Sequence, residues 1–116
     1  MITFDTLREL ALSFPETKEE PHFEKISFRV KKKIFATYDY KQKRVTVKLS
    51  EIDQDVFSSA NKAAIYPVEN KWGKQGWTVI EMASIKEDLF IDALITSYCE
   101  VAPKKLSILV RSDING

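Results

Sequence analysis

The 116-residue sequence has little of the chemistry from which most catalytic and metal sites are built. Cys99 is the only cysteine and His22 the only histidine, so an intramolecular disulfide and a cysteine zinc cluster are both excluded. No serine or cysteine nucleophile has a recognisable general base, and neither a phosphate loop nor a dinucleotide-binding glycine motif is present. We therefore predict a protein that is not an enzyme and that binds no cofactor or metal.

Signals for membranes and secretion are also missing. No apolar run approaches the roughly 20 residues that a membrane-spanning helix needs. Residues 1–5 lack the basic-then-apolar order of a secretory signal. A lone cysteine fits a reducing compartment. We expect a soluble cytoplasmic protein that has no membrane partner and is a monomer or a weak dimer.

What the sequence does have is positive charge gathered in one region. Residues 25–48 carry nine basic side chains against one acidic side chain, Asp39, whereas all other residues carry nine basic against sixteen acidic. The formal net charge of +1 hides this asymmetry. A positive region of this kind attracts phosphates or acidic partners.

Hydrophobic spacing predicts three helices. The first begins at the N-cap Thr3 and ends before Pro15, and the second begins at the N-cap Ser50 and closes at residues 61–62. The third follows a capping box formed by Ser84 and Glu87 and ends before Pro103. Each helix has an apolar side, and that of the third is so broad that we expect it to be buried on more than one side.

Strands are expected at residues 25–30, 34–40, 44–49 and 77–82, with a short extended piece at 63–69. Residues 16–22 are expected to form a loop and residues 71–77 a turn, while residues 106–110 form either an edge strand or an interaction tail. The order α-β-β-β-α-β-β-α, with tight turns between adjacent strands, predicts an α+β fold. It has two layers, an antiparallel sheet with helices on one face. We expect one domain over residues 1–106 and a C-terminal tail over residues 107–116.

Alternation within the strands converts the charge bias into a geometric prediction. In residues 25–30, Ile26, Phe28 and Val30 should face the core and leave Lys25, Ser27 and Arg29 in water. If residues 44–49 share that inward face, Arg44 and Lys48 lie on the opposite face as well.

Several short segments, taken in order, resemble the MmcQ/YjbR-like family of small bacterial domains. They are Ala11–Pro15, Glu20–Phe23, Ile26–Val30, Lys33–Thr37, Val47–Leu49 and Trp72–Trp77. The resemblance covers roughly residues 1–106 and implies a secretion-chaperone-like, or CyaY-like, α+β fold. It also implies a double-wing DNA-binding role, with residues 25–48 as the first wing and residues 63–82 as the second. It carries no catalytic residues.

The residues that we expect to contact nucleic acid are basic side chains of these wings and one aromatic side chain. They are Lys25, Arg29, Lys31, Lys32, Lys33, Lys43, Arg44, Lys48, Lys71, Trp72 and Lys74. Lysines can neutralise phosphates, or can simply keep exposed strands soluble and unpaired. Gly73 and Gly76 could converge backbone N–H groups on an anion, or only permit a turn. For Trp77 we favour a ring in the core.

The remaining distinctive residues favour structural roles. His22, beside Pro21 and Phe23, is more typical of loop packing than of catalysis or metal binding. Cys99 lies on the apolar side of its helix and is expected to be a small, unreactive core residue. The alternative function is a protein-interaction or chaperone-like adaptor module, indicated by the apolar breadth of the last predicted helix and the segment after Pro103.

Overall fold

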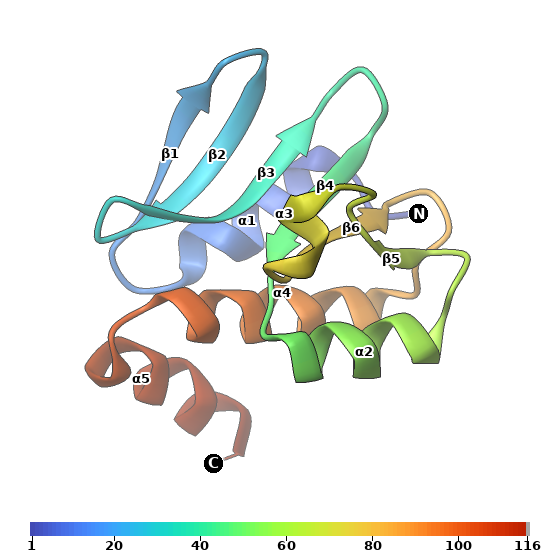
Figure 1. Cartoon of the computed structure of the whole chain (residues 1–116). Coiled ribbons are helices and arrows are strands. Elements are labelled where there is room, and N and C mark those ends of the chain that lie inside the picture. The colour runs from blue at the N-terminus through green and yellow to red at the C-terminus, as the bar shows by residue number, and fades with distance from the viewer. Residues whose placement is uncertain (116) are drawn as a thin grey trace.

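The computed structural model describes residues 1–115, with side chains through Arg111. Five helices and six strands follow one another in an α+β arrangement (Figure 1). The helices are α1 (Phe4–Ser13), α2 (Glu51–Ala60), α3 (Lys71–Lys74), α4 (Glu87–Val101) and α5 (Lys104–Asn115). The strands are β1 (Thr17–His22), β2 (Lys25–Val30), β3 (Lys33–Asp39), β4 (Arg44–Lys48), β5 (Ile65–Pro67) and β6 (Trp77–Glu81).

The six strands form one sheet in the order β1-β2-β3-β4-β6-β5, and every neighbouring pair is antiparallel. Helices α1, α2, α4 and α5 lie on one side of the sheet, and α3 lies against the other (Figure 1). We call the side that carries α3 the open face. The predicted α+β class and antiparallel sheet are confirmed, and all eight predicted elements occur in the predicted order.

Local signals set most helix ends as expected. The Oγ of Ser50 accepts a hydrogen bond from the backbone N–H of Asp53 at 3.0 Å, which satisfies one of the unpaired donors at the start of α2. Thr3 caps α1 in the same way, through the N–H of Thr6 at 3.2 Å. The predicted capping box of α4 is wrong. Lys86 is the N-cap and makes no side-chain capping bond, because the helix begins only at Glu87.

Three elements of the structure were not predicted from the sequence: β1, α3 and α5. The segment expected to be a loop is the edge strand β1, where Pro21 is tolerated because an edge strand leaves one row of backbone groups unpaired. The expected turn contains α3, which is too short to show a helical repeat. The segment expected to be an edge strand or a tail is part of α5, where Leu106 and Val110, one turn apart, are buried. The predicted boundary after residue 106 falls inside this helix.

The core lies between the sheet and the helices. Tyr98 of α4 is fully buried, and its ring centroid lies 4.9 Å from that of Phe14 and 5.4 Å from that of Phe35. The predicted inward residues Phe28 and Val30 are fully buried. Helix α4 has seven buried residues, so its broad apolar side is accounted for by its burial in the fold. No helix of the described chain is long and apolar enough to span a membrane.

Candidate functional site

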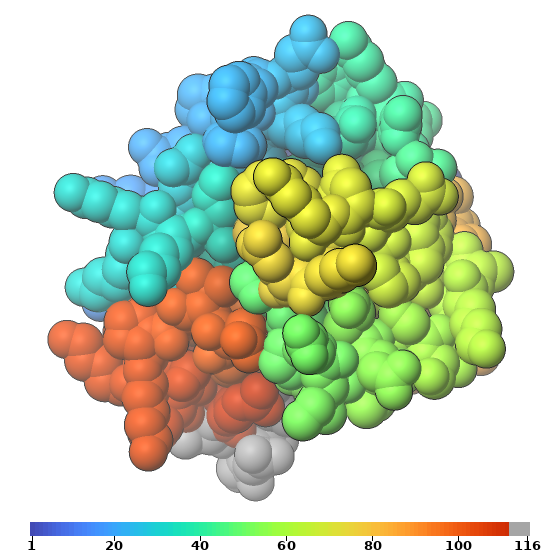
Figure 2. Space-filling model, viewed as in Figure 1, coloured from blue at the N-terminus to red at the C-terminus, as the bar shows by residue number. Residues whose placement is uncertain are grey.

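The open face carries the side chains that strand alternation turns away from the helices. Register joins Thr37 to Thr46 across β3 and β4, and Arg44 to Glu81 and Lys48 to Trp77 across β4 and β6. Arg44 and Lys48 therefore share this face, as the sequence predicts. Helix α3 stands on it as a ridge, beside the segments of β1 to β3 (Figure 2, yellow beside blue and cyan).

A cavity of about 370 Å³ lies on the open face, against α3. Its apolar lining comes from Ile34, Val68, Trp72 and Trp77. Its polar lining comes from His22, Lys25, Thr37, Thr46 and Asn70. Mostly apolar walls with a few convergent polar groups are typical of ligand-binding cavities.

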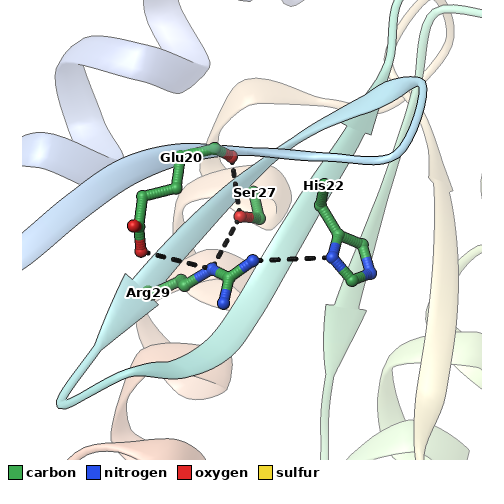
Figure 3. Close-up of polar contacts among 4 residues, drawn as sticks. All are labelled: Glu20, His22, Ser27 and Arg29. Carbon is green, nitrogen blue, oxygen red and sulfur yellow. Dashed lines mark hydrogen bonds and ion pairs between the residues drawn. The ribbon is translucent and has the colours of Figure 1, made fainter.

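Beside this cavity, Arg29 is held in a small polar network (Figure 3). Its Nε donates to the Oγ of Ser27 at 2.9 Å and lies 3.5 Å from a carboxylate oxygen of Glu20. Its Nη2 lies 3.5 Å from Nδ1 of His22. Ser27, expected in water, is buried because β1 covers it, and its Oγ donates to the backbone oxygen of Glu20 at 2.8 Å.

Two other predicted phosphate contacts are also paired with carboxylates. Nε of Arg44 lies 2.5 Å from an oxygen of Glu81, and this ion pair raises the pKa of the guanidinium. Nζ of Lys31 lies 2.7 Å from an oxygen of Glu16 and lowers the pKa of that carboxyl group. Lys48 donates instead to the backbone oxygens of Leu49 and Gln75. These side chains have partners within the fold.

The remaining predicted lysines are exposed and make no ion pair with the part of the chain that the structure describes. They lie in three places: the end of the β2–β3 hairpin, the opposite end of the sheet, and α3. Lys32 and Lys33 lie at the β2–β3 hairpin. Lys25 and Lys43 lie at the opposite end of the sheet, and Lys71 and Lys74 lie on α3. The structure therefore does not bring all the predicted basic residues into one cluster.

Charge is divided between the two sides of the molecule. Helices α1, α2 and α4 together carry nine acidic side chains and one basic side chain, Arg8. The β2 to β4 segment, residues 25–48, carries nine basic and one acidic. Helix α5, with Lys104, Lys105 and Arg111, is the basic exception on the helical side. A bias that is regional in the sequence thus becomes a difference between two faces.

The two tryptophans both line the cavity. Trp72 is 48% exposed, and its predicted role as a contact residue stays a prediction. The expectation that the ring of Trp77 lies in the core is wrong, because β6 alternation turns it to the open face.

Gly76 has a structural reason to be glycine. Its φ is +101°, and a Cβ there would lie 1.8 Å from the backbone oxygen of Leu49.

Sequence reasoning did not single out Thr37, Thr46 or Asn70. The first two could have been found by extending the alternation argument to β3 and β4, because they fall on the same face as Arg44 and Lys48. Asn70 could not have been found in this way, because its position depends on α3. It caps that helix by accepting a hydrogen bond from the N–H of Trp72 at 2.9 Å.

Comparison with known families identifies the chain. The family model named YjbR matches residues 12–100. The chain belongs to the YjbR family. The match covers strands β1 to β6 and most of α4, so the open face and its cavity lie within the family's domain.

One solved structure resembles this YjbR chain over most of its length. It is a Deinococcus radiodurans protein with a DUF419 family domain, and it superposes with a TM-score of 0.76 at 24% sequence identity. The alignment covers 86% of this chain and 78% of the other. At that identity the likeness supports the fold alone. The search of curated proteins found no match.

Within the described residues, no three side chains of His, Cys, Asp or Glu are placed to hold a metal ion. Burial raises the pKa of the Cys99 thiol, which lies 3.9 Å from the backbone oxygen of Ser107. A raised pKa leaves less thiolate at neutral pH and so makes the thiol less reactive.

Proposed function

We propose that this YjbR-family protein is a DNA-binding module without catalytic activity, which contacts phosphates through exposed lysines around its open face. The single observation that carries the proposal is the division of charge, with basic strands and turns on one side and acidic helices on the other. A polyanion on the open face would meet the basic side first. The cytoplasmic location expected from the sequence remains a prediction.

The acidic helices do not oppose this mode of binding. Charges in water at physiological ionic strength are screened over about 8 Å. The molecule is at least 28 Å across in every direction, and α1, α2 and α4 lie on the far side of the sheet. Their repulsion of DNA at the open face is therefore weak.

Among the basic residues, the exposed lysines are the stronger candidates for phosphate contact. Arg29, Lys31 and Arg44 would each have to exchange a carboxylate partner for a phosphate. Lys32 lies in the β2–β3 turn and Lys33 is the first residue of β3. Neither has such a partner within the described residues. Phosphate contacts by lysine release condensed counterions, so the affinity should fall as salt is added.

The test is an anisotropy titration of a labelled 20-base-pair DNA at two salt concentrations. We expect binding at low salt that weakens at higher salt. The double variant Lys32→Glu/Lys33→Glu should bind more weakly. It should also lower the slope of log affinity against log salt by roughly 0.9 for each phosphate that is no longer neutralised. The control is Lys62→Glu/Lys86→Glu, which makes the same charge change on exposed residues next to the ends of α2 and α4.

Two results would contradict the proposal. One is the absence of binding by the wild-type protein at low salt. The other is an equal loss of affinity in the two double variants, because that would reflect net charge and not the open face.

A second candidate function, a protein-interaction module, is favoured by exposed apolar side chains on the helical side. Ile52 and Val56 lie one turn apart on α2 and are 77% and 60% exposed. Ile108 and Leu109 on α5 are 50% and 53% exposed. A protein partner bound there would leave the open face uncovered, so substitutions at Lys32 and Lys33 would not affect its binding.

A further inference from the structure

The cavity beside Trp72 has a chemistry that phosphate binding alone does not require. Lysines on turns would bind a DNA backbone without any concave apolar surface. Here an exposed indole, two strand hydroxyl groups and an amide meet at one cavity, which Lys25 also lines. We infer that this cavity receives the unpaired base of a single-stranded nucleic acid, with the base stacked on Trp72. The inference rests on the proposed function and narrows its substrate class.

The size of the cavity suits one ring system. Small-molecule pockets span roughly 300–1,000 Å³, and this cavity, at about 370 Å³, lies near the lower limit. In a duplex the faces of the bases are stacked on one another and cannot reach a side chain. Only a base that has left the stack, or was never paired, can enter such a cavity.

The backbone that carries Trp72 is fixed against the fold. The backbone N–H of Trp72 donates to Oδ1 of Asn70. The next residue, Gly73, lies so close to the backbone of Val68 that no side chain would fit there. Nζ of Lys71 lies 5.6 Å from the centroid of the indole ring, although Lys71 does not line the cavity. A base entering the cavity therefore meets an exposed aromatic surface, on a fixed backbone, with a cation beside it. Stacking of this kind tolerates every base, because each has a π face.

The polar lining provides groups that can bond to the edge of a base. Thr37 and Thr46 are cross-strand partners, and each hydroxyl can donate and accept a hydrogen bond. Asn70 uses its side-chain oxygen to cap α3, which leaves its NH₂ group for a ligand. Nδ1 of His22 is turned towards Arg29, which leaves Nε2 for a ligand. Lys25, which also lines the cavity, supplies positive charge for the adjoining phosphate.

The test compares one labelled DNA sequence as a single strand and as a duplex, by anisotropy at fixed low salt. We expect the wild-type protein to bind the single strand more tightly. Trp72→Ala should lower the affinity for the single strand by roughly ten- to a hundredfold and leave the affinity for the duplex nearly unchanged. Trp72→Phe should restore most of the loss, because a phenyl ring still stacks. The control is Tyr40→Ala, which removes another half-exposed aromatic side chain that does not line the cavity.

The outcomes separate this inference from the proposed function. Equal affinity for both forms, unchanged by Trp72→Ala, overturns the base site but leaves phosphate binding intact. An equal loss for both forms in Trp72→Ala, not restored by Trp72→Phe, also overturns it, because it would show a structural role for the indole. No binding of either form at low salt overturns both. If Trp72→Ala does not fold, Thr46→Val keeps the side-chain shape, and an unchanged preference for the single strand would then count against the inference.

Discussion

Gly73 offers a direct test of how α3 is fixed against the sheet. A Cβ at this position would lie 1.9 Å from the backbone oxygen of Val68, whereas real Cβ atoms essentially never come closer than 3.0 Å to such an atom. Gly73→Ala must therefore move α3 or residue 68 by at least 1.1 Å, the difference between those two distances. Val68 cannot easily yield, because its N–H bonds the backbone oxygen of Trp77 at 3.0 Å.

The cost follows from what else must move with α3. Nε2 of Gln54 donates to the backbone oxygen of Gly73 at 2.9 Å. The N–H of Gly73 donates to the backbone oxygen of Asn70 at 3.0 Å. Overpacking in a tightly packed site typically costs about 1–3 kcal/mol. We expect Gly73→Ala to lower the free energy of unfolding by that amount and the Tm by roughly 4–12 °C.

The assay is urea denaturation followed by far-UV circular dichroism, with tryptophan emission as a second readout. Moving α3 changes the surroundings of Trp72, so the emission of the folded protein should shift. The control is Lys74→Ala, an exposed change on the same helix, which should stay within about 0.5 kcal/mol of the wild type. If Gly73→Ala matches that control in both stability and emission, α3 is not held by this close contact.

Two further predictions concern stability. Tyr98→Phe removes a hydrogen bond to the backbone oxygen of Pro15 at 2.7 Å and should cost about 1 kcal/mol in urea denaturation at neutral pH. Burial raises the pKa of Tyr98 to about 12, while the unfolded chain loses that proton near pH 10, so wild-type stability should fall between these values. An equal fall in Tyr98→Phe would contradict the assignment. Phe23 has a φ of +59° and is 95% exposed, so Phe23→Asn should raise the free energy of unfolding by several tenths to about 1 kcal/mol. A lower midpoint in urea would instead mean that the ring contact of Phe23 with His22 outweighs the backbone strain.

The sequence was sufficient to predict the strands in which polar and apolar residues alternate. Alternation in β2 predicted the inward residues Ile26, Phe28 and Val30. Phe28 and Val30 are fully buried, and Ile26 is partly buried against the core. Strand β1 could not be found in this way, because an edge strand carries charged residues on both of its faces. Glu19, on the helical side of β1, is acceptable there because Arg8 of α1 lies 2.7 Å from its carboxylate.

The surroundings of Arg29 depend on that missed strand. Alternation correctly placed Arg29 on the open face, but the expectation that its side chain lies in water is wrong, because it is held by partners within the fold. Its partners Glu20 and His22 lie on β1, and only the β1–β2 register brings them beside it. Sequence spacing alone does not distinguish an arginine that is held by carboxylates from one that is exposed to solvent. For that reason the predicted site included both basic residues that are ion-paired with carboxylates and basic residues that are not.

Ion pairing also separates two kinds of basic residue. Arg29 and Arg44 are bound to carboxylates and help to fix the sheet, whereas Lys32 and Lys33 extend from a turn without a partner in the described chain. Flexible lysines of this kind attract phosphates at any position along a backbone and carry no information on sequence. Selectivity needs fixed groups, and the cavity between β3, β4 and α3 brings several of them together. Affinity and selectivity should therefore respond to different substitutions, the first at the turn and the second at Trp72.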